Sequence, residues 1–371
     1  MVKNNRHPDY GLLISAALII LAGFVIFVSV SMARMAIIEE GVDQVNLNYF
    51  LFRQFVFGVL PGIVLGFVAY NIPLEKLRKF APALLFLSIV LVLLVFVPGV
   101  GRKMRGATRW IGIGSFSFQP TEFLKLTFIL YLASWLSGRK REKKKRIFSE
   151  TLIAFLIFSG FIGGLILLQP DLSTLLVIIL TGFVMYFVYG NPLSHIFVIG
   201  LGGTLSLVLA VVLTPYRMQR VRDLISSGMD PQGLSYQAQQ ALIAIGSGGI
   251  FGLGFGMGYR KYGYIPLVMS DSIFAAYAEE AGFIGSLVLI GLFLVFAWRG
   301  VKIAKESTDP FLGLVATGIT FWIFFQAFVN IGSMVGVVPM TGIPLPLISH
   351  GRAHFISELA ALGILLNISR S

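Results

Sequence analysis

Long, nearly uninterrupted runs of apolar residues alternate with shorter polar connections along most of this chain. Ten such runs can be marked, at about 12–33, 51–71, 80–98, 120–137, 150–168, 172–189, 195–213, 273–297, 311–333 and 352–368. Their lengths approach the roughly 20 residues that a helix needs to cross the hydrocarbon core of a bilayer. Strands of a membrane β-barrel would instead alternate apolar and polar residues in short segments. The pattern predicts an all-α polytopic membrane protein with ten transmembrane helices.

Basic residues in the connections indicate an orientation. The densest group is GRKREKKKR at 138–146, and lysines and arginines also follow the second and eighth runs. Such residues accumulate on the cytoplasmic side, so an even number of spans places both termini in the cytoplasm. The connection 214–270, rich in glycine and polar residues, then forms a long extracytoplasmic loop between helices 7 and 8. We expect residues 1–371 to form a single transmembrane domain with this loop inside it.

Composition supports this class and narrows the chemistry. Hydrophobic residues make up 56% of the 371 residues and charged residues 12%, and the mean hydropathy is +0.86. The absence of cysteine excludes disulfides, iron–sulfur clusters and thiol nucleophiles. The four histidines form no H-x-x-x-H pair within a span, which argues against a haem or zinc enzyme.

Basic residues also gather in connections expected on the outer side. They lie in GRKMRGATRW and PYRMQRVRD and are Arg102, Lys103, Arg105, Arg109, Arg217, Arg220 and Arg222. Contact with anionic lipid headgroups and a site for a phosphate-bearing substrate are both open explanations. The run at 138–146 is interpreted as a topology signal, so no nucleic-acid partner is expected.

Two charged residues fall inside the fourth apolar run. Glu122 and Lys125 are three positions apart and share one helical face, and Pro120 suits the first turn of that helix. Charges within a span are costly and usually face a partner or a cavity. The pair is interpreted either as an ion pair that neutralises two buried charges or as the lining of a polar cavity open to the outside.

Other polar residues interrupt apolar segments. In QPDLST, Pro170 ends one helix, and Asp171 either caps the next or contacts substrate. Arg53 lies just inside the second run and either snorkels outward or belongs to a site. Gln326 and Asn330 are four apart on one face of the ninth run, where hydrogen bonding between helices is expected.

An aspartate opens the eighth run, in VMSDSIFAAYAEEAG at 268–282. Asp271 can cap the helix, a role that Ser270 could fill equally well. At the outer face, close to the basic loops, it is also a candidate general base. Glu279 and Glu280 lie about two turns deeper and are interpreted as support for the helix and its cavity, not as a second catalytic acid.

Six blocks of sequence occur together in a characteristic order. They are GATRWIGIGSFSFQPTEFLKL (106–126), QPDLST (169–174), PYRMQRV (215–221), YQAQQALIAIGSGGIFGLGFG (236–256), DSIFAAYAEEAGFIG (271–285) and NIGSMVGVVPMTGIPLPLIS (330–349). They resemble the signature blocks of the SEDS family (shape, elongation, division and sporulation), whose main members are FtsW and RodA. DSIFA and IAIGSGGIFGLGFG are more similar to the FtsW branch than to the RodA branch.

The resemblance implies a peptidoglycan glycosyltransferase. Such an enzyme polymerises lipid II into glycan strands at the outer face of the bacterial cytoplasmic membrane and releases undecaprenyl diphosphate. Its implied partners are lipid II and undecaprenyl-linked glycan, membrane lipids, other division proteins, and a class B penicillin-binding protein, which is a transpeptidase. An FtsW-like member is expected at the division septum.

The resemblance also implies roles for individual residues. Asp271 matches the essential aspartate of the family and is the expected base. Residues that match the polar cavity or are expected to bind substrate are Arg53, Arg102, Lys103, Arg109, Glu122, Lys125, Asp171, Arg217 and Gln237. Among these, Arg109 with Arg102, Lys103 or Arg217 is the expected diphosphate clamp. A divalent cation, Mg²⁺ or Mn²⁺, is left open, and Asp271 is then its ligand instead of the base.

One block departs from the family pattern, and two other functions remain open. Where the family has an aromatic and small residues, this chain reads ISHGRAHF, with His350, Gly351, Arg352, Ala353 and His354. This raises the question of how the last helix packs. The alternatives are a lipid II flippase or transporter and a RodA-like elongation polymerase. We find no internal repeat of the kind that transporters often show.

Overall fold

The computed structural model describes residues 7–38, 47–104, 107–113, 116–139, 149–192, 194–214, 218 and 234–371. Each predicted apolar run coincides with a helical segment. The first five are α1 (Tyr10–Ile38), the consecutive elements α2 (Leu47–Gln54), η1 (Phe55–Val59) and α3 (Leu60–Asn71), then α4 (Leu74–Leu94), α5 (Pro120–Ser137) and α6 (Glu150–Leu168). The others are α7 (Leu172–Val188), α8 (Ser194–Val212), α11 (Ile273–Glu306), α12 (Pro310–Met334) and α13 (Arg352–Ser369).

Length and composition test which of these helices can cross a membrane. Among the described residues, six segments are long and apolar enough: 10–33, 51–71, 74–94, 150–168, 273–306 and 310–334. Helices α7 and α8 are apolar but give shorter segments. The chain is therefore a multi-pass membrane protein, and the count of ten spans stays a prediction.

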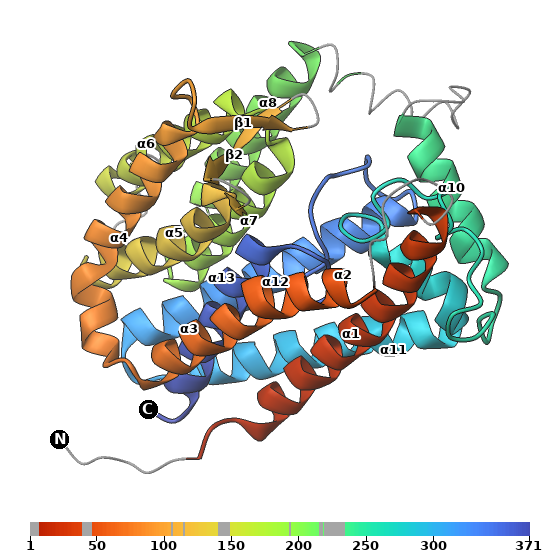
Figure 1. Cartoon of the computed structure of the whole chain (residues 1–371). Helices are drawn as coiled ribbons and strands as arrows, with labels where there is room; N and C mark the ends of the chain where they lie inside the picture. The colour runs from red at the N-terminus through yellow and green to blue at the C-terminus, as the bar shows by residue number, and fades with distance from the viewer. Residues whose placement is uncertain are drawn as a thin grey trace.

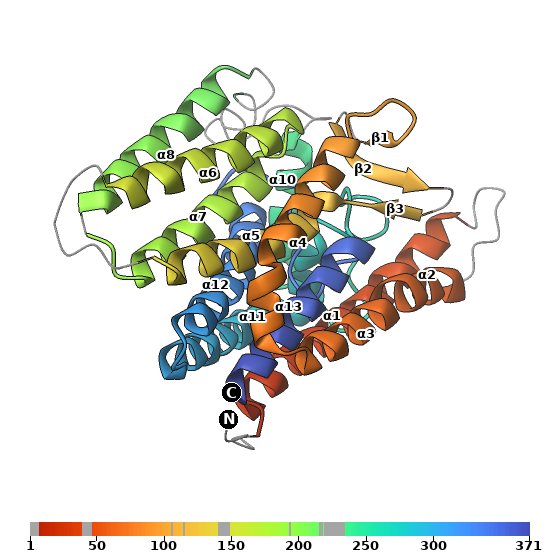
Figure 2. The ribbon, with the colours of Figure 1, turned by 90° about the vertical axis from the view of Figure 1, so that its left-hand side faces the viewer.

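Helix α12 lies at the centre of the bundle (Figures 1 and 2). It packs against α5, α7, α11 and α13, and α13 packs in turn along α3. Helices α4 and α6 to α8 lie on one side of this centre, and α1 and α11 lie on the other. The start of α1 meets the end of α13, where the backbone N–H of Asp9 donates to Ser369 Oγ over 3.0 Å.

The sequence predicts an all-α chain, but the structure also contains a small β-sheet. Among the described residues, β1 (Gly101–Met104), β2 (Ala107–Ile113) and β3 (Phe116–Phe118) form an antiparallel sheet in that order. Arg102 pairs with Trp110, and Ile111 pairs with Phe118. The sheet lies at the end of the bundle away from the C-terminus (Figures 1 and 2). Alternation in WIGIGSFSF was the available signal for a hairpin, but glycines and basic residues made the segment read as a loop.

A kink divides α11. The helix has 34 residues, which at 1.5 Å per residue is about 51 Å, well beyond the roughly 30 Å of hydrocarbon in a bilayer. Gly282 interrupts it with φ 69° and ψ −168°. A side chain there would collide with the backbone of Gly252, which packs directly against the kink. Only glycine fits both the backbone angles and the contact.

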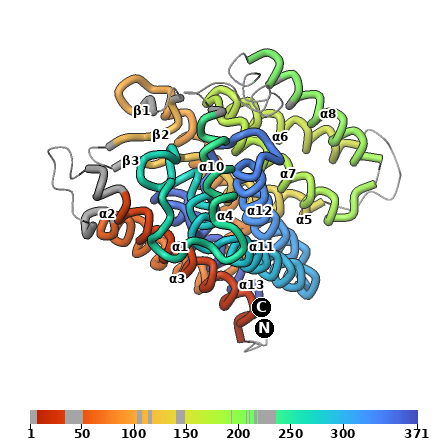
Figure 3. Tube along the Cα trace, turned by 90° about the vertical axis from the view of Figure 1, so that its right-hand side faces the viewer, coloured from red at the N-terminus to blue at the C-terminus, as the bar shows by residue number. Residues whose placement is uncertain are grey.

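The described part of the 214–270 connection is structured and packs against the kink in α11. It contains α10 (Leu234–Ser247) and a loop that lies against α11 (Figure 3). Four backbone hydrogen bonds of 2.9 to 3.1 Å join this loop to α11: Leu253 N to Glu279 O, Gly254 N to Glu280 O, Phe283 N to Gly249 O, and Ile284 N to Ile250 O. Backbone groups released by the kink are thus paired, as groups away from water require.

Candidate functional site

Asp271 lies two residues before the first residue of α11 and is 6% exposed. The N-cap residue of α11 is Ser272, and its side chain makes no capping bond within the described residues. Neither Asp271 nor Ser270 is therefore the N-cap itself, and Asp271 lies next to it; the helix begins at Ile273, where the eighth apolar run was predicted to begin. A role for the Asp271 carboxylate other than capping is left open by this geometry.

Met269, Ser270 and Asp271 lie just before α11, and the backbone carbonyl of each accepts a hydrogen bond from the segment 330–350. His350 N donates to Met269 O over 2.8 Å, and Ser349 Oγ donates to Ser270 O over 2.6 Å. The side-chain amide of Asn330 donates to Asp271 O over 2.8 Å. The backbone at Asp271 is consequently fixed by a part of the chain far from it in sequence.

The carboxylate of Asp271 faces the backbone of Gly342. A methyl group at Gly342 would lie 3.7 Å from Asp271 Oδ2, and Gly342 itself is exposed. On another side, Gln237 of α10 donates through Nε2 to Ser272 Oγ over 2.9 Å. Of the residues expected to bind substrate, Gln237 is thus brought next to the Asp271 segment.

Glu279 holds a turn of the loop that leads to Asp271. Its Oε1 accepts hydrogen bonds from Tyr259 N at 3.0 Å and from Arg260 N at 3.1 Å. Arg260 continues the connection, because its Nη1 donates to Gln240 Oε1 of α10 over 2.9 Å. The carboxylate joins α11 to the loop, and the loop is joined to α10.

Glu280 binds the same loop through a buried ion pair. Lys261 Nζ lies 2.6 Å from Glu280 Oε1, and both side chains are at most 5% exposed. Ser29 of α1 donates to the same oxygen over 2.5 Å, and Gly256 N donates to Oε2 over 3.1 Å. The interpretation of the two glutamates as structural support agrees with these contacts. Lys261, which the sequence did not single out, completes the charge pair.

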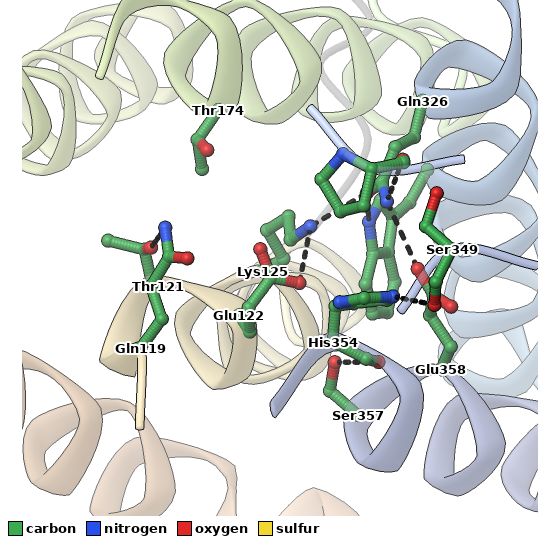
Figure 4. A network of polar contacts seen from close by, with 12 residues as sticks. Gln119, Thr121, Glu122, Lys125, Thr174, Gln326, Ser349, His354, Ser357 and Glu358 are labelled. Atoms are coloured by element: carbon green, nitrogen blue, oxygen red, sulfur yellow. Dashed lines mark hydrogen bonds and ion pairs between the residues drawn. The ribbon is translucent and has the colours of Figure 1, made fainter. Parts of the chain in front are cut away.

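A second buried network surrounds the predicted Glu122–Lys125 pair (Figure 4). Lys125 Nζ lies 2.9 Å from Glu122 Oε2 and donates to Gln326 Oε1 over 2.7 Å. It also lies over the ring of Trp322, 5.0 Å from the centroid. The ion-pair interpretation is confirmed. Lys125 borders a narrow gap between α5, α7 and α12 with no room for a water molecule, so a cavity open to the outside stays a prediction.

The same network reaches the segment that holds Asp271. Gln326 Nε2 donates to Pro344 O over 3.1 Å and to Glu358 Oε1 over 3.0 Å. Glu358 Oε2 in turn accepts from Leu347 N over 2.8 Å. Figure 4 shows Glu358 and Gln326 converging on this segment beside Ser349. Sequence reasoning missed Glu358, although a carboxylate in an apolar helix was the signal that could have found it.

Arg109 and Asp171 meet at the turn between α6 and α7. Asp171 is the N-cap of α7, and its Oδ1 accepts from Thr174 N over 3.2 Å, which confirms the capping interpretation. Arg109 Nη1 lies 3.9 Å from the same oxygen. The guanidinium also donates to the carbonyls of Gln169 and Pro170. Arg109 thereby joins β2 to this turn and remains half-buried at its surface.

The structure describes only some of the other basic residues that were predicted to bind substrate. Arg102 of β1 is exposed and its side chain lies across Gly112 of β2, whereas Arg53 of α2 is half-buried. The side chain of Lys103 and the whole of Arg217 lie outside the described residues. A diphosphate clamp built from Arg109 with these residues stays a prediction.

The atypical ISHGRAHF segment is accommodated by specific contacts. The ring of His350 stacks on Phe27 of α1, with centroids 5.3 Å apart. Arg352 Nη2 contacts Ser117 Oγ of β3 at 3.4 Å, and its guanidinium lies over the ring of Phe57 in η1. His354 Nε2 lies 3.0 Å from Ser349 O. These contacts pack the start of α13 against α1, η1 and β3.

Comparison with known proteins decides the family. A family model described as a cell cycle protein, named for FtsW, RodA and SpoVE, matches residues 10–371. The chain belongs to the SEDS family. It is 37% identical to stage V sporulation protein E of Bacillus subtilis, over 100% of this chain and 99% of that protein. It is 34% identical to a probable peptidoglycan glycosyltransferase FtsW of Trichlorobacter lovleyi, over 99% of this chain and 95% of that protein.

Solved structures of the SEDS family show the same fold. The rod shape determining protein RodA of Thermus thermophilus has a TM-score of 0.71 and 30% identity, over 98% of this chain and 97% of that one. A chain from a peptidoglycan synthase complex that coordinates polymerization and crosslinking has a TM-score of 0.78 and 31% identity, with 98% of both chains covered.

Proposed function

We propose that this SEDS protein is a peptidoglycan glycosyltransferase that polymerises lipid II and releases undecaprenyl diphosphate. The observation that carries the proposal is the placement of Asp271: a carboxylate at the start of α11, facing an exposed glycine, on backbone held by three hydrogen bonds. The names of full-length relatives, among them probable peptidoglycan glycosyltransferases, support the same assignment.

The reaction needs a base and positive charge. The 4-hydroxyl of one disaccharide-lipid attacks the anomeric carbon of the other, a C–O bond forms, and the bond to the diphosphate breaks. Asp271 takes the proton of the attacking hydroxyl. Arg109, with Arg102, Lys103 or Arg217, stabilises the charge that develops on the leaving diphosphate.

A divalent cation is an alternative role for the same carboxylate. Among the described residues, no three His, Cys, Asp or Glu side chains converge on one point. Protein ligands from the described part of the chain therefore do not form a closed site, and Asp271 would share Mg²⁺ or Mn²⁺ with oxygens of the diphosphate. Glycan synthesis that survives chelation with EDTA would assign Asp271 to the base role.

The family and the charges of the chain support the cellular setting that we propose. We place the termini in the cytoplasm, the 214–270 connection outside, and the enzyme in the bacterial cytoplasmic membrane. A class B penicillin-binding protein is the proposed partner, and the match to a synthase complex supports it. We assign the chain to division, at the septum, with elongation as the alternative. A fluorescent fusion that follows the lateral wall instead of the septum would reverse that choice.

One experiment tests the enzymatic assignment. Purified protein with its transpeptidase partner receives lipid II in detergent, and glycan chains are separated by length. Wild type is expected to make chains and Asp271→Ala none. Asp309→Ala is the matched control, because Asp309 also begins a helix but caps α12, where it accepts from Phe311 N. No product from wild type, or equal product from Asp271→Ala, would reject the polymerase. Lipid II flipping in liposomes would then test the transporter.

A further inference from the structure

Asn330 connects two backbone segments with one side-chain amide. It lies in α12 and is fully buried. Its Nδ2 donates to Asp271 O over 2.8 Å and to Ile343 O over 2.7 Å. Its Oδ1 has no hydrogen-bond partner among the described residues. The two donated bonds therefore determine how this amide is oriented.

The two carbonyls belong to opposite sides of the candidate site. Asp271 O is on the residue that carries the carboxylate. Ile343 O is on the neighbour of Gly342, whose backbone the carboxylate faces. A single amide thus sets the separation between the carboxylate and the surface that it faces. Ser349 and His350, which hold the neighbouring carbonyls, lie in the irregular segment between α12 and α13, whereas Asn330 belongs to a long helix.

We propose that Asn330 is a positioning residue for Asp271, which sets the rate of glycosyl transfer without touching substrate. This inference rests on the proposed role of Asp271 as the base. Displacement of a reacting group by about 1 Å can cost about a hundredfold in rate. Loss of the amide is accordingly expected to lower kcat and to leave KM nearly unchanged, because the basic residues proposed to hold the diphosphate belong to other elements.

A merely structural asparagine would behave differently, and the chain supplies one for comparison. Asn367 of α13 is 4% exposed, and its Nδ2 also donates to two backbone carbonyls, those of Ala69 and Ile72. It lies near the C-terminal end of α13, beside the end of α3. Asn330→Leu and Asn367→Leu each replace a buried amide by an apolar side chain of similar shape. Each substitution removes two donated hydrogen bonds.

The test measures kcat, KM and the midpoint of thermal unfolding for both variants, in the complex with the transpeptidase partner. Both midpoints are expected to fall by similar amounts. Asn330→Leu is expected to lose about tenfold to a hundredfold in kcat with KM within twofold, and Asn367→Leu to keep kcat within twofold. Equal losses of kcat in the two variants, or wild-type kcat in Asn330→Leu, would overturn the inference.

Two further measurements keep the outcome clear. If Asn330→Leu does not fold, Asn330→Ser and Asn367→Ser replace the pair, with the same expected difference in kcat. Asp271→Ala is assayed alongside. If Asp271→Ala is inactive while Asn330→Leu keeps wild-type kcat, only the positioning role fails. If Asp271→Ala is itself fully active, the proposed base fails and the positioning role fails with it.

Discussion

Lys261 Nζ and Glu280 Oε1 lie 2.6 Å apart in an ion pair that is almost completely shielded from solvent. Lys261 belongs to the loop before Asp271, and Glu280 belongs to α11. The ion pair therefore holds that loop against α11 at a point ten residues before Asp271 in the sequence.

Removing the lysine should destabilise the protein strongly. Lys261→Met leaves Glu280 buried without its cation, which costs about 3 to 5 kcal/mol. The midpoint of thermal unfolding in detergent is expected to fall, and the double variant Lys261→Met with Glu280→Gln is expected to recover part of the loss. Lys302→Met is the control, because the Lys302–Glu306 pair is 3.8 Å long and largely exposed, so its loss should change stability by less than about 1 kcal/mol. Equal midpoints for Lys261→Met and Lys302→Met would contradict the prediction.

Substitution at the kink should disrupt the junction between α11 and the loop. Gly282→Ala places a Cβ against the backbone of Gly252 and imposes a positive φ on an alanine. The monodisperse fraction in size-exclusion chromatography and the unfolding midpoint are both expected to fall. Gly291→Ala lies in the same helix, and among the described residues no atom outside the local helix backbone lies within 4 Å of the added methyl. It should be neutral or slightly stabilising, and a matching loss there would disprove the explanation.

The glycine that faces the candidate base should be sensitive in activity but not in stability. Apart from Gly342 and its two chain neighbours, the only atom of the described residues within 4 Å of a methyl group at Gly342 is Asp271 Oδ2, at 3.7 Å. Gly342→Ala should therefore fold normally and reduce glycan synthesis by about tenfold, because the methyl occupies space beside the carboxylate. Gly164→Ala provides the comparison in α6, because no described atom beyond its local helix backbone lies within 4 Å of the added methyl. Unchanged synthesis in Gly342→Ala would show that substrate approaches Asp271 from another side.

Acidification should weaken the contact between the start of α1 and α11. Burial alone would raise the pKa of the Asp9 carboxyl, but hydrogen bonds from Arg299 and from Leu12 N–H outweigh it and hold the pKa below its ordinary value of 3.8. A carboxyl with a lowered pKa contributes stability above its unfolded pKa, and this contribution is lost as pH falls through the folded value.

Asp9→Asn keeps an oxygen for Leu12 N–H but loses the charge that pairs with Arg299. At neutral pH it is expected to lower stability by about 1 kcal/mol relative to wild type. The difference in unfolding midpoint should shrink as the pH is lowered below about 4. A difference that stays constant from pH 7 to pH 3 would mean that the charge of Asp9 contributes nothing.

The helices and the short-range contacts of this fold were predictable from sequence, and the long-range contacts were not. Apolar runs predict helices because side-chain periodicity and the thickness of the bilayer both constrain residues that are close together in sequence. The Glu122–Lys125 pair and the Asp171 cap follow from separations of three residues. The link from Asn330 to Asp271 spans 59 residues, and spacing could indicate only that Gln326 and Asn330 share a helix face.

Two errors have a local cause. The sheet at residues 101–118 was missed because its strands are short and carry glycines and basic residues, which also characterise loops. The cap of α11 was misplaced by one or two residues because Ser270, Asp271 and Ser272 are all favourable capping types. In that segment the hydrogen bonds of the folded protein, not residue preference, determine where the helix begins.

The amide of His350 holds Met269 O through the main chain, and this limits what sequence variation at position 350 can do. Any residue except proline supplies the same N–H. In this chain the residue is a histidine, whose ring stacks on Phe27. The side chain at position 350 can therefore vary without loss of the hydrogen bond to Met269 O. Ser349, which acts through its hydroxyl, has no such freedom.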